Sequence, residues 1–135
     1  MSDGANDSAA DLSATLTALL RARQLPELIA RWHAADDLER SPDAARSAAI
    51  ALAELRQLDD AQAVIDRWLT ESNDVLTRVL CARVAFDLGH YRKALDRIEP
   101  LIGATTMRPS WWVVYLRSAV GCGEAERALR HHSTY

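Results

Sequence analysis

The segment from Val75 to Ile102 has apolar residues at helical spacing on both sides of a glycine, and its pattern recurs elsewhere in the chain. Apolar side chains recur three and four positions apart before Gly89 and again from Tyr91 onward, which predicts two amphipathic helices. Gly89 stands where a left-handed residue can end the first helix at little cost. Because the link between the two helices is so short, they must lie antiparallel.

The apolar positions of this hairpin recur with a nearly constant interval. The six positions Leu88, Tyr91, Ala94, Ile98, Leu101 and Ile102 each lie 33 residues after Leu55, Leu58, Ala61, Ile65, Trp68 and Leu69. One position can be followed through four copies, as Leu28, Ala61, Ala94 and Ala128. A period of about 34 residues is the signature of an array of helical hairpins, so the sequence predicts an all-α repeat fold.

The run Leu88–Gly89–x–Tyr91–x–x–Ala94 resembles the turn of a tetratricopeptide repeat, with Ala94 at the family's small inter-helix position. Trp112 and Tyr115 also fall where that family favours large residues in a first helix. The repeats are degenerate, because the family's early Leu–Gly pair is Cys81–Ala82 even in the best copy. The resemblance implies a right-handed α-solenoid of about four antiparallel helix hairpins.

The repeat phase gives the expected domain organisation. Residues 1–9 are small and polar without an apolar period, and we expect a disordered tail there. Residues 10–135 form the repeat domain, with hairpins at about 10–35, 42–71, 74–103 and 110–132. Ser41 is an expected N-cap, and either Asn73 or Asp74 is expected to cap the helix that follows them. Pro100 is expected to stop or kink its helix near Ile98 or Glu99, and Pro109 or Ser110 to open the next one.

Composition limits the possible partners and compartment. Apolar residues make up 49% and charged residues 26% of the chain, an ordinary balance for a soluble domain. A net charge of −3 argues against nucleic acid, whose phosphates require a clustered positive surplus. The sequence shows no secretory leader and no long apolar run, which argues against a membrane. Two isolated cysteines suit a reducing compartment, so we expect a cytoplasmic protein.

In tetratricopeptide proteins the first helices of successive repeats line a concave groove, and the resemblance therefore implies a set of groove residues here. They are Arg46, Ile50, Val79, Arg83, Phe86, Val113 and Arg117. Arginines between apolar side chains suit an extended or helical peptide that carries acidic groups. The alternative interpretation is that these arginines only solvate helix faces.

The end of the chain suggests a second candidate surface. Ala125, Ala128 and Leu129 have no following helix to cover them, although the last repeat of a solenoid needs a polar outer face. Either a longer chain continues the array, or another molecule covers this flank. That molecule is a partner protein or a second copy of the chain, and a second copy would give a homodimer. Of two adjacent tryptophans we assign Trp112 to the core and Trp111 to the exposed flank.

The sequence offers no catalytic or metal-binding pattern. It has no glycine-rich phosphate loop, nucleophile elbow or paired-cysteine ligand set, so we expect neither an enzyme nor a cofactor. His131 and His132 are adjacent rather than one helical turn apart, which does not favour metal chelation. Two functions remain: an adaptor, scaffold or chaperone that binds another protein in its groove, or a docking and oligomerisation domain of a larger protein or enzyme.

Overall fold

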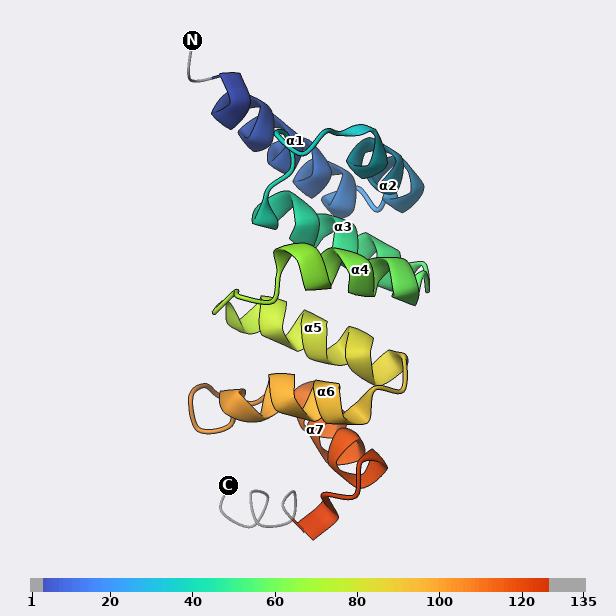
Figure 1. Cartoon of the computed structure of the whole chain (residues 1–135), viewed down its shortest axis with the longest axis vertical. Helices are drawn as coiled ribbons and strands as arrows, with labels where there is room; N and C mark the ends of the chain where they lie inside the picture. Colours follow the sequence, from blue (N-terminus) through green and yellow to red (C-terminus); the bar gives the residue numbers. More distant parts are fainter. Residues whose placement is uncertain (1–3, 127–135) are drawn as a thin grey trace. The chain divides into compact units, whose positions relative to one another are not determined.

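The computed structural model describes the backbone of residues 4–126 and the side chains from Ala10 onward, and it shows an all-α fold (Figure 1). This confirms the all-α part of the predicted fold class. Its helices are α1 (Gly4–Arg21), α2 (Leu25–Ala34), α3 (Pro42–Glu54), α4 (Leu58–Trp68), α5 (Val75–Asp87), α6 (Tyr91–Ile98), the short 3₁₀ turn η1 (Glu99–Leu101) and α7 (Pro109–Gly121). Within this part of the chain, every helix is too short or too polar to span a lipid bilayer.

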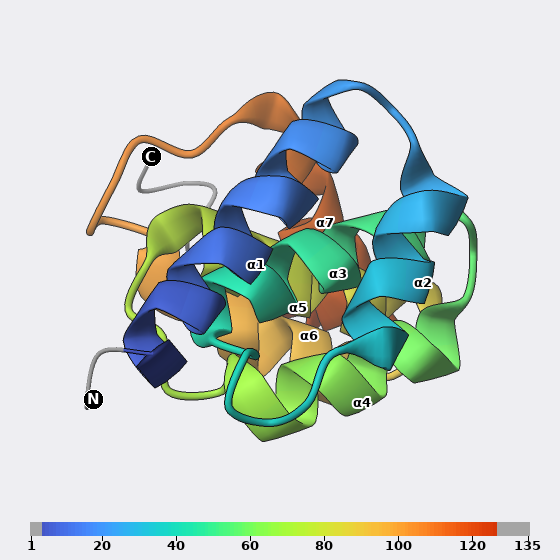
Figure 2. The same cartoon turned by 90° about the horizontal axis from the view of Figure 1, so that it is seen from above.

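The chain divides into two compact units, Met1–Glu71 and Ser72–Tyr135. In the first unit, α1 and α2 form one hairpin and α3 and α4 form another, and α3 packs against both α1 and α2. Figure 2 shows α3 behind these two helices. In the second unit, α5 and α6 form a hairpin, and α7 packs against both of them. Each unit therefore shows the same relation, in which a first helix rests on the hairpin before it.

The turn that follows each first helix has the same backbone conformation. One residue with positive φ stands at the same place in every copy: Arg23 (61°), Arg56 (61°), Gly89 (81°) and Gly123 (81°). In the third copy the amide of Gly89 donates to the Phe86 carbonyl at 2.9 Å and that of His90 to the Ala85 carbonyl at 2.8 Å. These two bonds are the Schellman motif that satisfies the last carbonyls of a helix. The intervals of 33, 33 and 34 residues repeat in the backbone as well as in the sequence.

The change Gly89→Ala is expected to destabilise the second unit by about 1–2 kcal/mol, because a Cβ is unfavourable in the left-handed region. The effect comes from the backbone alone, since an added Cβ would meet no atom of the described residues within 4 Å. Gly123→Ala meets the same conditions and should cost about as much. Urea denaturation followed by circular dichroism measures both. Variants as stable as the parent would show that the left-handed turn carries no such strain.

The N-caps lie where the sequence places them. The Ser41 hydroxyl accepts a hydrogen bond from the Ala44 amide at 3.2 Å. The Asp74 carboxylate accepts one from the Thr77 amide at 3.0 Å. Each bond satisfies an amide in the first turn that has no partner within its own helix. Both caps confirm the predicted starts of α3 and α5.

The prolines also act as predicted. Helix α6 ends at Ile98, and the chain continues through Pro100 as the 3₁₀ turn η1. Helix α7 begins at Pro109, whose missing amide costs nothing at a first position. Helix α2 begins at Leu25, one residue before Pro26.

Helix α1 begins at Gly4, six residues before the predicted start at Ala10. Residues 4–9, which the sequence assigned to the tail, are therefore helical. The prediction relied on an apolar period, which residues 4–9 lack. The last turns of the predicted hairpin at 110–132 lie beyond residue 126, outside the part that the structure describes.

The cores of both units depend on small side chains. The alanine-rich α3 has five alanines with no exposed surface: Ala44, Ala45, Ala48, Ala49 and Ala51. Larger residues that are also fully buried are Leu16, Leu28, Leu52 and Ile65 in the first unit and Leu95, Ile98 and Tyr115 in the second. Small residues on one helix let its neighbours approach closely, which is how short helices bury enough surface to be stable.

The burial of the two adjacent tryptophans is the reverse of what the sequence predicted. Trp111 is 7% exposed and belongs to the core of the second unit, whereas Trp112 is only partly buried. Trp111 shares a face of α7 with the buried Val114, Tyr115 and Ser118, which lie three, four and seven positions later. Trp112 lies on the next face, where its ring and that of Tyr115 are T-shaped with their centres 5.8 Å apart. Trp111 is therefore not part of an exposed flank.

Candidate functional site

Helices α5 and α7 present the same pattern of side chains. Each has an apolar residue, an arginine four positions later and an apolar residue after three more. These residues are Val79, Arg83 and Phe86 on α5, and Val113, Arg117 and Val120 on α7. The second set lies 34 positions after the first, so the residues occupy equivalent places in two repeats. Spacings of three, four and seven put each set on one face of its helix.

A first hollow lies between these two helices. It has a volume of about 260 Å³, and four of the predicted groove residues line it: Val79, Arg83, Phe86 and Val113. Asp87, Ser110, Trp111 and Val114 complete its walls. The side chain of Val113 is exposed to 46%, which is unusual for a large aliphatic residue beside a core.

A second hollow, with a volume of about 460 Å³, adjoins the first because Phe86 lines both. We call it the Tyr91 hollow, and its walls are Phe86, Tyr91, Leu116, Arg117, Val120 and Gly121. The ring centres of Phe86 and Tyr91 lie 5.7 Å apart, with an angle of 59° between the ring planes. Val120 is exposed to 66%. Of the groove residues predicted from sequence, Phe86 and Arg117 lie here.

The Tyr91 ring reaches α7 only because residue 121 is a glycine. A Cβ at Gly121 would lie 2.5 Å from Tyr91 Cδ2 and 2.6 Å from Cγ, closer than carbon atoms approach. The contact involves the base of the ring as well as its edge, so any side chain at position 121 would displace Tyr91. The wall of the hollow is therefore built from three elements, α5, α6 and α7.

The arginines of the surface differ from others in the same unit. Arg92 pairs with Glu124 at 3.0 Å, and Arg97 donates to the Cys81 carbonyl at 3.1 Å. Within residues 10–126, the exposed side chains of Arg83 and Arg117 make no ion pair or hydrogen bond. Asp87 lies in the first hollow together with Arg83, whereas the described part of the chain contributes a single charged residue, Arg117, to the Tyr91 hollow.

The second unit thus brings together five of the seven predicted groove residues. Arg46 and Ile50 belong to α3 in the first unit and line neither hollow. Arg46 is partly buried and pairs with Asp43 on its own helix at 3.7 Å. Sequence reasoning missed Val120, although it lies 34 positions after Phe86, and it missed the roles of Tyr91 and Gly121.

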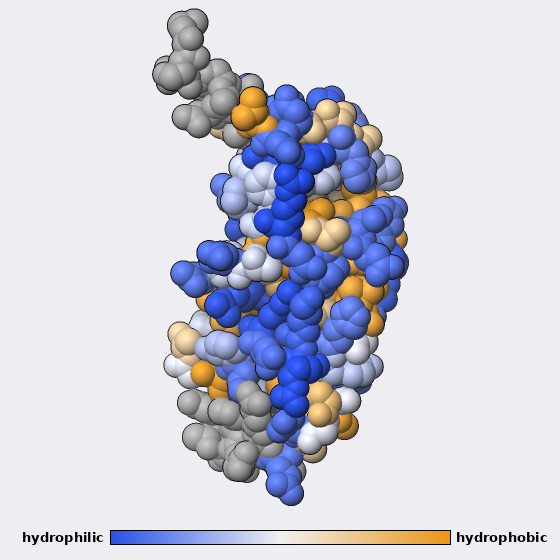
Figure 3. Space-filling view, viewed as in Figure 1, coloured by the Kyte–Doolittle hydropathy of each residue, from blue (hydrophilic) through white to orange (hydrophobic). Residues whose placement is uncertain are grey.

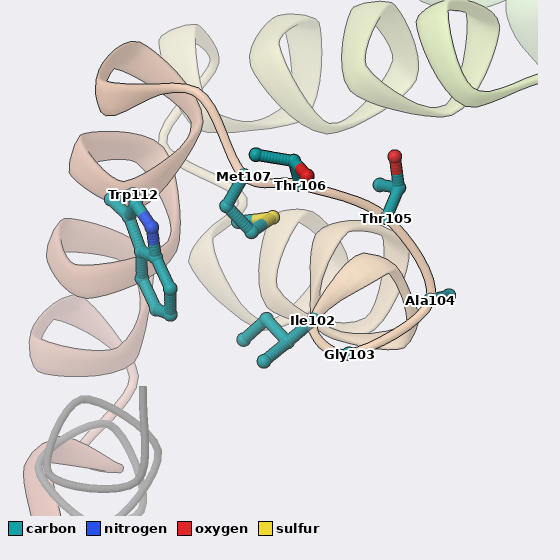
Figure 4. Close-up of a pocket in the computed structure, with 7 residues that line it drawn as sticks. All are labelled: Ile102, Gly103, Ala104, Thr105, Thr106, Met107 and Trp112. Carbon is teal, nitrogen blue, oxygen red and sulfur yellow. The ribbon is translucent and has the colours of Figure 1, made fainter.

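The predicted self-association flank is only partly described. Ala125 is exposed, and Ala128 and Leu129 lie outside the described residues. A hollow of about 510 Å³ lies beside Trp112, between α7 and the loop from Ile102 to Met107. Figure 4 shows the side chains of Trp112, Met107 and Ile102 along its border, with Thr105 turned away. In the space-filling view, hydrophobic residues form separate patches among hydrophilic ones (Figure 3).

The described residues hold no group of three or more histidine, cysteine or acidic side chains that could bind a metal ion. Cys81 is buried and Cys122 is partly buried, and no disulfide joins them. Compared with protein-family models, curated proteins and solved structures, the chain matches none. Any function must therefore be inferred from the chain's own residues.

Proposed function

We propose that the chain is a module of degenerate tetratricopeptide-like repeats, stacked as an α-solenoid, that binds a peptide or helix of another protein. The binding surface is the face shared by α5 and α7. The observation that carries the proposal is the repeated apolar–arginine–apolar set, which lines two adjoining hollows. A partner segment that lies across both helices would meet the same chemistry twice.

The exposure of apolar residues on this face supports the proposal. Val113 and Val120 are 46% and 66% exposed, and partly buried Phe86 lies between the hollows. Apolar side chains gathered around concave surface are a frequent mark of an interaction site. An amphipathic helix or extended peptide would bury them, and the arginine stems beside them would pack on its apolar groups.

A second candidate is a docking or oligomerisation domain of a larger protein. The hollow beside Trp112 favours it, because a partly buried tryptophan next to Met107 is a suitable anchor for a partner or second copy. Light scattering on the isolated chain, repeated with Trp112→Ala, tests for a self-associated state that depends on this hollow.

The proposed function can be tested with short random peptides displayed internally on a carrier protein. Peptides that bind the parent chain are expected to lose affinity by about tenfold or more when Val113→Asp places a charge in the surface. The matched control is Leu38→Asp, which alters another exposed apolar residue, 71% exposed and in the first unit. The proposal would be contradicted if Val113→Asp left the affinity of the peptides unchanged, or if Leu38→Asp lowered it as much. A library that yields no binding peptide would also contradict it.

A further inference from the structure

We propose that the Tyr91 hollow is the anchor site of the surface and that it selects an acidic partner segment. One bulky apolar side chain of the partner enters the hollow, and a Glu or Asp about one helical turn away on the same segment pairs with Arg117. This inference rests on the proposed function, because it names the partner's chemistry for that same surface.

The walls of the hollow require an apolar occupant. Phe86, Leu116 and Val120 contribute apolar side chains, and the Tyr91 ring closes one side. A polar group packed against these apolar side chains would lose water without a hydrogen bond from them in return, which costs free energy. The volume of about 460 Å³ lies in the range of about 300–1,000 Å³ typical of ligand pockets, and it leaves room for one large side chain.

The charge of the hollow selects a carboxylate. Among residues 10–126, Arg117 is the only charged residue that lines the hollow, and its side chain makes no ion pair or hydrogen bond to another residue in that range. A guanidinium presents paired donors that match the two oxygens of a carboxylate, and it repels lysine or arginine. The first hollow is lined by Asp87 as well as Arg83, and these opposite charges give it no comparable preference for a carboxylate.

The hollow also depends on a single glycine. Tyr91 is 37% exposed, so its ring can swing into solvent when a methyl group occupies its place beside α7. Gly121→Ala therefore removes the wall with the smallest possible change in sequence. Alanine also favours helix over glycine, which offsets part of any loss of stability. This variant separates the shape of the hollow from its charge.

The peptides selected on the parent chain test the inference. They are expected to carry a bulky apolar residue and a Glu or Asp three or four positions from it. Arg117→Glu should lower their affinity by about tenfold or more, because a charge-assisted pair is replaced by repulsion. Exchanging the acidic residue of the peptide for lysine should restore binding to Arg117→Glu. Arg21→Glu, a reversal at an exposed position of α1, is the control and should have little effect.

Gly121→Ala is expected to weaken the same peptides by about tenfold, with the circular dichroism spectrum unchanged. If Val113→Asp abolishes binding but Arg117→Glu and Gly121→Ala do not, the inference is wrong and the proposed function stands. Peptides that show no acidic preference would also overturn it. If no surface variant affects binding, both the inference and the proposed function fail.

Discussion

Replacing Trp111 with alanine is expected to reduce the free energy of unfolding of the second unit by about 3–5 kcal/mol. The indole is 7% exposed and packs in the core with Val114 and Tyr115. The guanidinium of Arg108 lies 5.1 Å from the ring centre and covers one face. Removing the ring leaves a cavity that short helices on several sides can fill only in part, and the variant loses both transfer energy and packing contacts.

The neighbouring change, Trp112→Ala, provides the control. Trp112 is partly buried and meets Tyr115 through an edge contact at 5.8 Å, so its loss should cost only about 1–2 kcal/mol. Urea denaturation followed by circular dichroism, with amide hydrogen exchange to isolate the second unit, measures both values. A larger loss for Trp112→Ala would restore the assignment made from the sequence, with Trp112 in the core.

The hairpins could be predicted because each depends on local chemistry. Ser41 and Asp74 cap helices through bonds to amides three residues away, and Pro109 fixes a start without any distant contact. Gly89 ends α5 because its own backbone adopts positive φ. Signals of this kind act within one turn of helix, so a single sequence is enough to read them.

The turns at Arg23 and Arg56 show where local signals fail. Both adopt the same left-handed conformation as Gly89, but an arginine gives no hint of it. A signal did exist, because each begins the same Arg–Gln–Leu triplet, at positions 23–25 and 56–58. The repeat was visible in apolar positions, whereas its turn could be recognised only from the geometry.

The assignments that failed depend on packing between helices. The rotation of α7 against α5 and α6 decides which of the two adjacent tryptophans is buried. The buried Val114 and Tyr115 already favour the helix face that carries Trp111. The close approach of Tyr91 to Gly121 joins two helices in the same way. No sequence spacing predicts such a contact.

The change Ala61→Leu is expected to destabilise the first unit by about 3 kcal/mol, because a larger side chain does not fit where α4 meets α3. Ala61 has no exposed surface. Ala63→Leu, two positions away on the same helix, is exposed and should alter stability by no more than about 0.5 kcal/mol. Leucine and alanine are both good helix formers, so the difference between the variants reports packing rather than helix propensity.

The repeat itself explains why size matters at this position. In the second and third hairpins, the residue at the position of Ala61 and the residue twelve positions earlier are both alanine. These pairs are Ala49 with Ala61 and Ala82 with Ala94. In the first hairpin both are leucine, Leu16 and Leu28, and all six residues are fully buried. The two positions thus change size together, which indicates that they set the spacing between the helices of a hairpin. Equal stability of Ala61→Leu and Ala63→Leu, measured by urea denaturation, would show that this spacing is set elsewhere.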